Sequence, residues 1–201
     1  MTPYVSLRNP PEKRRAYCTG GKEKHLTEAA VMIAFALHLL DKGASEVEIH
    51  PDGEHGKRYD IRGCLKSRGF MLREARGTTA YGGVYHDNNQ ELTVFPKPGL
   101  GDVRAKLSGN TVVAECKGGV INTSHSGQLS KLRKGLCEAV GLLMARSQNG
   151  ERHIAVVPAS EETTKLAVRM RNRASAAGIE IALVNESGDI EFVRNRFAAK
   201  A

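Results

Sequence analysis

Three charged residues near the middle of the chain have types and spacing that suit metal-assisted chemistry: Asp102, Glu115 and Lys117. They lie in the stretch from Gly101 to Gly119, where apolar and polar residues alternate on both sides of Ser108-Gly109-Asn110, a pattern typical of a β-hairpin. Successive side chains of a strand point to opposite faces, so the three charged groups are expected at one end of one face. Two carboxylates there can bind a divalent metal, and the lysine adds positive charge. This set suits metal-assisted hydrolysis of a phosphodiester bond.

The turn predicts how the two strands pair. Gly109-Asn110 as a two-residue loop with glycine first favours a type II′ turn. In that register Asp102 lies opposite Lys117, and Arg104 lies opposite Glu115. The other face of the hairpin is then entirely apolar, and its members are Val103, Ala105, Leu107, Val112, Ala114 and Cys116. That face is expected to pack into the core.

This hairpin resembles the core of the PD-(D/E)xK nuclease superfamily, which has the restriction-endonuclease-like fold. The matching residues are Gly101-Asp102 followed by Glu115-Cys116-Lys117. The resemblance is close over the hairpin and extends to the rest of the chain only in the order of its elements. It implies that Asp102 and Glu115 bind Mg²⁺ or Mn²⁺, with the backbone carbonyl of Cys116 as a further ligand. It also implies that Lys117 orients the attacking water or stabilises charge in the transition state.

A helix before the core strands often supplies one more acidic residue in this superfamily. The sequence predicts a helix over residues 24–42, and Glu28 lies on its apolar stripe. Glu28 is therefore the first candidate for this acid, although a first-turn glutamate that complements the helix dipole is an alternative. Glu54 and Asp60 are rival candidates, because a second helix–strand unit is predicted to begin near residue 58.

The helix predicted over residues 127–146 follows the hairpin and contributes further candidates. Gln128 lies at its start, where related nucleases often have a polar residue near the metal site. Its next turn carries basic residues suited to contact phosphates, or to form an ordinary exposed face: Lys131, Arg133 and Lys134. His125, in the loop before the helix, is a candidate to orient water or a phosphate.

The order of helix, strand, hairpin, helix, strand, helix and strand predicts a three-layer α/β fold with a mixed central sheet flanked by helices. That order is similar to the restriction-endonuclease-like fold. The predicted organisation is an irregular basic N-terminal arm over residues 1–22 and a single nuclease-like domain over residues 23–201. A segment over roughly residues 51–98 is predicted to be an insertion in that domain.

The composition points to a partner of opposite charge. The chain has 201 residues and a formal net charge of +8, so nucleic acid is the first candidate partner, with DNA preferred to RNA. No apolar run reaches the roughly 18–20 residues of a membrane span, and no signal peptide is evident, so a cytoplasmic location without a membrane partner is expected. A homodimer is also expected, because cleavage of a duplex needs two cuts.

The predicted function is therefore a metal-dependent endonuclease. Two alternatives come from other classes: a non-catalytic nucleic-acid-binding module on the same fold, and a structural protein whose basic surface meets an acidic partner. Metal binding separates the first alternative from the enzyme, and a salt-dependent affinity for nucleic acid separates the second.

Overall fold

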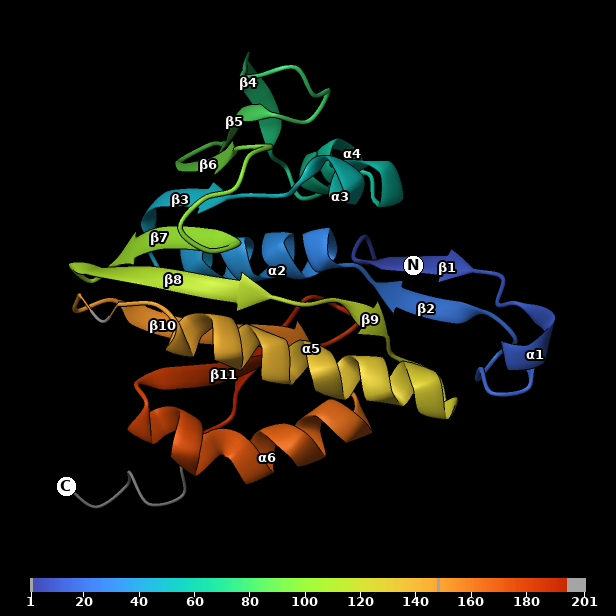
Figure 1. Cartoon of the computed structure of the whole chain (residues 1–201). Helices are drawn as coiled ribbons and strands as arrows, with labels where there is room; N and C mark the ends of the chain where they lie inside the picture. The colour runs from blue at the N-terminus through green and yellow to red at the C-terminus, as the bar shows by residue number, and fades with distance from the viewer. Residues whose placement is uncertain (1, 148, 195–201) are drawn as a thin grey trace.

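The computed structural model describes residues 2–147 and 149–194, which form a mixed α/β fold around one large sheet (Figure 1). The strands of this sheet, in chain order, are β3 (Ser45–Ile49), β4 (Met71–Ala75), β5 (Gly83–Asp87), β6 (Gln90–Val94), β7 (Val103–Leu107), β8 (Asn110–Cys116), β10 (Arg152–Pro158), β11 (Ile179–Val184) and β12 (Ile190–Phe192). Their spatial order is β12-β11-β10-β8-β7-β3-β6-β5-β4. The strands β8, β10 and β11 run parallel, whereas β7 is antiparallel to β8.

Three further strands form a small antiparallel sheet in the order β1-β2-β9. They are β1 (Val5–Arg8), β2 (Glu23–Leu26) and β9 (Gly119–Val120). The helices are α1 (Glu12–Arg15), α2 (Glu28–Asp41), α3 (Gly53–Arg58), α4 (Ile61–Ser67), α5 (Ser126–Met144) and α6 (Glu161–Ala176). Among the described residues, no helix is both long enough and apolar enough to cross a lipid bilayer.

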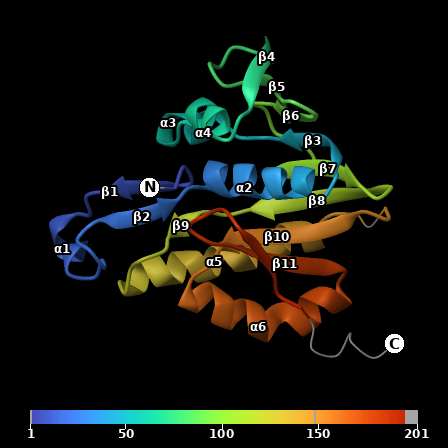
Figure 2. The same ribbon diagram turned by 180° about the vertical axis from the view of Figure 1, so that it is seen from behind.

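Helices cover both faces of the large sheet, with α2 on one face and α5 and α6 on the other (Figure 1, Figure 2). Buried side chains form one cluster on each face. Phe35 and Cys116 belong to the cluster on the α2 side, whereas Val113 and Leu136 belong to the cluster on the α5 side. Neighbouring residues of β8 thus enter different clusters, so this strand is buried on both faces. The predicted α/β fold with a mixed sheet flanked by helices is confirmed.

The central hairpin has the predicted faces but not the predicted register. Val103 pairs with Ala114, and Leu107 pairs with Asn110, so the two-residue loop is Ser108-Gly109. Both loop residues have positive φ, 51° and 81°, as a type I′ turn requires. The predicted Gly109-Asn110 loop is therefore wrong, and so is the pairing that it implied. Each residue of β7 pairs with the β8 residue two positions earlier than predicted. A shift of two residues leaves every side chain on its predicted face.

The predicted apolar face of this hairpin is confirmed, because most of its side chains are buried on the α2 side. Fully or almost fully buried are Val103, Ala105, Val112, Ala114 and Cys116.

The N-terminal segment differs from the irregular arm predicted for residues 1–22. Its strand β1 pairs with β2, and Tyr4 is only 2% exposed. The Tyr59 hydroxyl donates a hydrogen bond to the Pro3 carbonyl at 2.6 Å, which ties this segment to the chain before α4. Burial of one large aromatic ring and pairing with β2 together outweigh the irregularity that the prolines and glycines of this segment favour.

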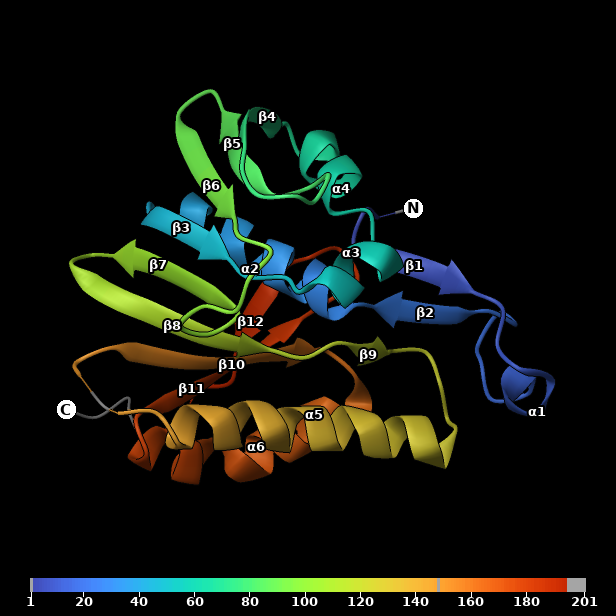
Figure 3. The ribbon, with the colours of Figure 1, turned by 45° about the horizontal axis from the view of Figure 1, so that its top comes forward.

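The elements that carry the predicted site meet at the carboxyl end of β8. Figure 3 shows the start of α2, the short helix α3 and the end of β8 close together. Gly118 lies at this junction: a Cβ there would come within 2.4 Å of the Glu28 nitrogen and 2.6 Å of the Leu26 carbonyl oxygen. The chain can therefore leave β8 directly against the start of α2 only because this residue is glycine.

We expect Gly118→Ala to destabilise the fold by about 1–3 kcal/mol, because the added methyl group meets backbone that cannot rotate away. Gly141→Ala is the matched control, since a Cβ there meets nothing within 4 Å and alanine is the better helix former by about 1 kcal/mol. Urea unfolding of both variants measures this difference. Equal stability of Gly118→Ala and the wild type would contradict the close approach.

Candidate active site

Four charged or titratable side chains from different elements surround the end of β8. Glu28 begins α2, His55 lies in α3, Asp102 directly precedes β7, and Lys117 directly follows β8. The Glu28 carboxylate links two of the others, because its Oε1 lies 3.5 Å from Lys117 Nζ and 3.5 Å from His55 Nε2. The chain therefore brings together segments that are far apart in the sequence, and three of the four residues were candidates in the sequence.

Glu28 is placed by the start of α2. Thr27 caps this helix, and its side chain accepts a hydrogen bond from the Ala30 N–H at 3.2 Å. A carboxylate in the first turn is stabilised by the helix dipole, which was the alternative explanation for this residue. Glu28 also contacts Lys117, so the dipole explanation and proximity to the predicted site hold together.

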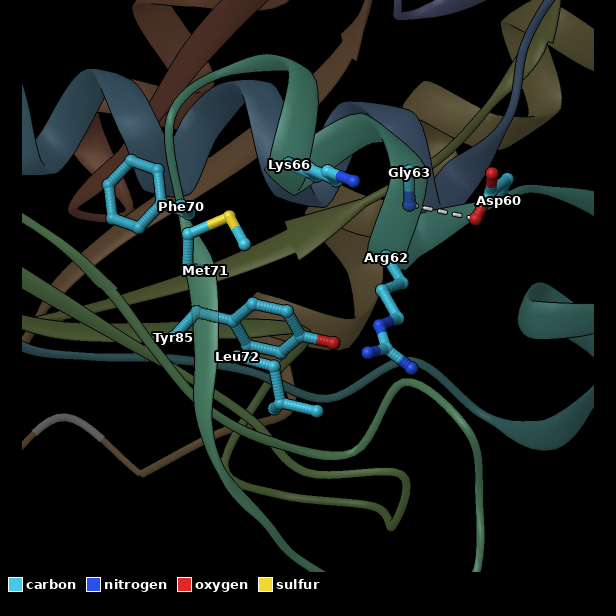
Figure 4. Close-up of a pocket in the computed structure, with 8 residues that line it drawn as sticks. All are labelled: Asp60, Arg62, Gly63, Lys66, Phe70, Met71, Leu72 and Tyr85. Carbon is cyan, nitrogen blue, oxygen red and sulfur yellow. Dashed lines mark hydrogen bonds between the residues drawn. The ribbon is translucent and has the colours of Figure 1, made fainter.

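The two rival acids have local partners instead. Glu54 is exposed and pairs with Lys57 at 2.6 Å and with Arg58 at 3.6 Å. Asp60 caps α4, where its Oδ1 accepts a hydrogen bond from the Gly63 N–H at 2.8 Å (Figure 4). Asp60 and Lys66 both line a pocket of about 380 Å³ beside α4 and β4. Figure 4 draws the residues that line it. Of the three upstream acids, Glu28 is the one that the structure places against Lys117.

Asp102 is held in place by the backbone of the neighbouring strand. Its Oδ2 accepts a hydrogen bond from the Cys116 N–H at 2.7 Å, and its own N–H donates to the Ala114 carbonyl at 2.9 Å. The preceding Gly101 has a φ of 89°, and a Cβ there would come within 2.9 Å of the Ala114 carbonyl oxygen. The Gly101-Asp102 pair therefore has a physical basis, because only glycine lets the chain enter β7 at this point.

The surroundings of Asp102 favour its protonated form. Burial raises the pKa of this carboxyl to about 7, and the charges of Glu115 and Glu28 add to the rise. The Cys116 N–H and the Lys117 ammonium act in the opposite direction but do not outweigh the burial. Negative charge is thus crowded at this point, and a bound cation would relieve the crowding.

Glu115 lies on the opposite side of β8 from Cys116 and is only 5% exposed. Its Oε1 accepts a hydrogen bond from the Arg146 guanidinium, just beyond the end of α5. No sequence pattern indicated Arg146, because this residue is 31 positions away and meets Glu115 only through the packing of α5 on β8. Glu115 is therefore close enough to influence Asp102 electrostatically, yet its charge is already balanced by an arginine.

Lys117 is held between two carboxylates. Its Nζ lies 3.1 Å from Glu138 Oε1 on α5 and 3.5 Å from Glu28 Oε1. Burial lowers the pKa of the lysine, but Glu28, Glu138 and Asp102 outweigh burial, so the pKa lies above its usual value. The side chain is therefore a fixed positive charge at neutral pH. Glu138 was missed in the sequence, where it is one of several polar residues on an exposed helix face.

His55 belongs to the site although it was not a candidate in the sequence, where it lies within the predicted insertion. Its segment leads into α3, which is capped by Asp52, whose Oδ1 accepts from the His55 N–H at 2.9 Å. The imidazole Nδ1 accepts from the Asp52 N–H at 3.0 Å, which leaves Nε2 directed toward Glu28. The hydrogen bond to Glu28 raises the pKa of His55, and burial opposes the rise. The signal available in the sequence was the Asp-x-x-His spacing of a capping box.

The residues predicted on and before α5 have structural partners. His125 caps α5, and its Nδ1 accepts from the Gly127 N–H at 3.2 Å. Arg133 pairs with Glu162 at 2.9 Å, whereas Lys131 and Lys134 are exposed. Gln128 is buried in the first turn of α5. Within the described part of the chain, no hydrogen bond or ion pair joins these residues to Glu28, Asp102 or Lys117.

The site is not arranged as a ready-made cation cage. Over residues 2–147 and 149–194, no group of three or more histidine, cysteine, aspartate or glutamate side chains is arranged to hold a metal ion. The carboxylates of Glu28 and Glu115 are instead turned toward Lys117, His55 and Arg146. The donor set still fits Mg²⁺ or Mn²⁺, because these ions prefer carboxylate oxygen and Asp102 is a half-buried carboxyl that has no cationic hydrogen-bond partner among the described residues.

The raised pKa of Asp102 predicts a pH dependence of folding stability. The pKa is about 7 in the folded protein and about 3.9 in the unfolded chain, so the folded state binds more protons between these values. Stability without metal should therefore fall as the pH rises from about 4 to about 7. We expect Asp102→Asn to remove this fall and to be roughly 1–4 kcal/mol more stable than the wild type at pH 8, with little difference at pH 4.

Urea unfolding in a chelator from pH 4 to pH 8 measures this dependence. Asp41→Asn is the matched control, because Asp41 is exposed at the end of α2. Parallel stability profiles of Asp102→Asn and the wild type would show that this carboxyl is not strained by its surroundings.

No family model, no curated protein and no solved structure matches this chain. The resemblance to PD-(D/E)xK nucleases therefore stays a prediction from the hairpin residues, and the chain is assigned to no family.

Proposed function

We propose that the protein is a metal-dependent nuclease that hydrolyses phosphodiester bonds, in DNA in preference to RNA, on a fold of the restriction-endonuclease-like kind. The observation that carries the proposal is the crowding at the end of β8. The half-buried Asp102 has a pKa raised by desolvation and by two neighbouring carboxylates, next to a lysine that stays charged. Carboxylates that lie close together can bind a divalent metal, and a fixed cation beside them can offset the charge of a phosphate.

In this proposal Asp102 and Glu115 hold the metal. The N–H of Cys116 is bonded to Asp102, which keeps the backbone of this residue beside the carboxylate, and the Cys116 carbonyl is the proposed third ligand. When bound, Mg²⁺ or Mn²⁺ lowers the pKa of a coordinated water and offsets charge on the phosphate. Glu115 contributes either through the oxygen that Arg146 does not occupy or by releasing Arg146.

Lys117 supplies positive charge in this proposal at the place where the phosphate would gain negative charge. Its ammonium is restrained by Glu28 and Glu138, so little reorganisation is needed before reaction. Glu28 is the proposed upstream acid, because it lies against Lys117 and because its charge contributes to the raised pKa of Asp102. Gln128 and the basic residues of α5 remain candidates for contacts to the nucleic acid farther from the reacting bond.

One observation favours a second function, a nucleic-acid-binding module without catalysis on the same fold. The Glu115 carboxylate already accepts a hydrogen bond from Arg146, as a structural ion pair would. A titration with Mn²⁺ followed by calorimetry separates the two functions. Binding that Asp102→Asn abolishes supports the nuclease, and absence of binding at millimolar Mn²⁺ supports the module.

We expect Asp102→Asn and Lys117→Met to lower the rate of cleavage by about 10²–10³-fold or more while the protein stays folded. Lys106→Met is the matched control, since Lys106 is exposed on the same hairpin and pairs with Glu46. The measurement is cleavage of labelled duplex, single-stranded and branched DNA and of RNA with Mg²⁺ or Mn²⁺. Failure of the wild type to cut any of these substrates, or equal rates for Lys117→Met and Lys106→Met, would refute the proposed reaction.

A separate pair of variants tests the upstream acid. We expect Glu28→Gln to slow cleavage at least about tenfold, because it removes a negative charge that holds Lys117 and His55. Glu54→Gln should cleave at the wild-type rate, because Glu54 is exposed and paired within α3. The reverse order of these two effects would transfer the role to Glu54.

A further inference from the structure

A polar pocket of about 220 Å³ lies directly beside the candidate active site. Its walls come from the small sheet β1-β2-β9 on one side and from α3 on the other. They include Arg8, His25, Glu28, His55, Arg58 and Gly118. Glu28 and His55 thus belong both to this pocket and to the group around Lys117, so the two sites share a wall.

Two guanidinium groups give the pocket a positive character. Arg8 donates a hydrogen bond to the Arg58 carbonyl at 3.0 Å, and within the described residues no carboxylate pairs with it. Over residues 2–147 and 149–194, the acidic partner of Arg58 is a distant one, Glu54 at 3.6 Å, and both of these side chains are mostly exposed. Exposed pairs of this kind contribute little, so neither arginine is committed to an acidic partner.

The acidic wall of the pocket is already offset. The Glu28 carboxylate is shared by Lys117 and His55, each at 3.5 Å. His25 is held at the side of the pocket by Glu23, whose carboxylate lies 2.9 Å from its Nε2. Burial lowers the pKa of His25, and the charge of Arg8, which lines the same pocket, adds to this effect. The uncommitted charge facing the pocket is therefore that of the two arginines.

This chemistry is specific for an oxyanion. Arginine pairs in a bidentate manner with phosphate, and the volume is several times the roughly 30 Å³ that one water occupies in the liquid. A phosphate with part of its sugar fits such a space. The position beside Glu28 favours a nucleic-acid phosphate over a free anion, because the proposed hydrolytic residues form the adjoining wall.

We propose that this pocket binds a phosphate of the substrate strand next to the phosphate that is cleaved. This inference rests on the proposed nuclease function. It makes the β1-β2-β9 sheet part of the substrate-binding surface, and β1 lies in the segment over residues 1–22 that was predicted to be an irregular basic arm. In this arrangement one phosphate of the nucleic-acid strand lies between Arg8 and Arg58, and the next phosphate lies at Lys117.

The first arm of the test uses inorganic phosphate with metal-free protein. We expect phosphate to shift the imidazole NMR signals of His25 in a saturable way and to leave those of His153 unchanged, because His153 is buried in β10 far along the sheet. Arg8→Gln should weaken this binding at least about fivefold. Lys42→Gln, with the same change of charge at the other end of α2, should not.

The second arm uses a labelled DNA duplex in a chelator over a series of salt concentrations. The slope of log K against log salt should fall by about 1 for Arg8→Gln and stay unchanged for Lys42→Gln. Arg58→Gln, on the exposed face of α3, provides the same readout if Arg8→Gln does not fold. An unchanged slope for the arginine variants overturns the proposal, and so does phosphate binding without any effect on the duplex, which would indicate a site for free phosphate only.

The two arms also separate this inference from the nuclease proposal. A wild type that binds DNA through Arg8 but cuts nothing with Mg²⁺ or Mn²⁺ supports the phosphate pocket and contradicts the proposed reaction. A wild type that cuts DNA at a rate unaffected by Arg8→Gln, with an unchanged salt slope, contradicts the pocket alone.

Discussion

Negative charge gathered at the buried end of β8 is the constraint on which the rest of the site depends. Asp102 is half-buried and close to two other carboxylates, and desolvation together with these charges raises its pKa to about 7. A shift of that size corresponds to roughly 4 kcal/mol of unfavourable interaction for the charged form. A fold of ordinary stability tolerates such a cost where function requires it, and Lys117 offsets only part of it.

The surrounding structure can be understood as the means of bringing these charges together without breaking the core. Two glycines allow close backbone approaches, Gly101 at the entry to β7 and Gly118 at the exit from β8. The cap of α3 turns His55 toward Glu28, while α5 provides both Glu138 and, just beyond its end, Arg146. Glu28, Glu115 and Glu138 thereby each have a cationic or imidazole partner. Among the described residues Asp102 has only the Cys116 backbone N–H as a hydrogen-bond partner, so it is the position where a metal would gain most.

The parts of this arrangement that depend on local patterns could be predicted from the sequence. Alternation along Val103–Leu107 and Asn110–Cys116 gave the correct faces, because period-two patterning needs no knowledge of the rest of the chain. The register was not predictable, because Ser108-Gly109 and Gly109-Asn110 are both acceptable two-residue turns. His55, Glu138 and Arg146 were missed for a different reason. Their places follow from how α3 and α5 pack, which no local pattern encodes.

The proposed metal site is tested most directly by a crystal of the protein soaked in Mn²⁺ and measured at the manganese absorption edge. The proposed chemistry requires an anomalous peak within about 2.5 Å of carboxylate oxygens of both Asp102 and Glu115, with Arg146 sharing or leaving the Glu115 carboxylate. A crystal that binds Mn²⁺ elsewhere, or that shows no peak between these two residues at saturating metal, would contradict a metal-dependent nuclease at this site.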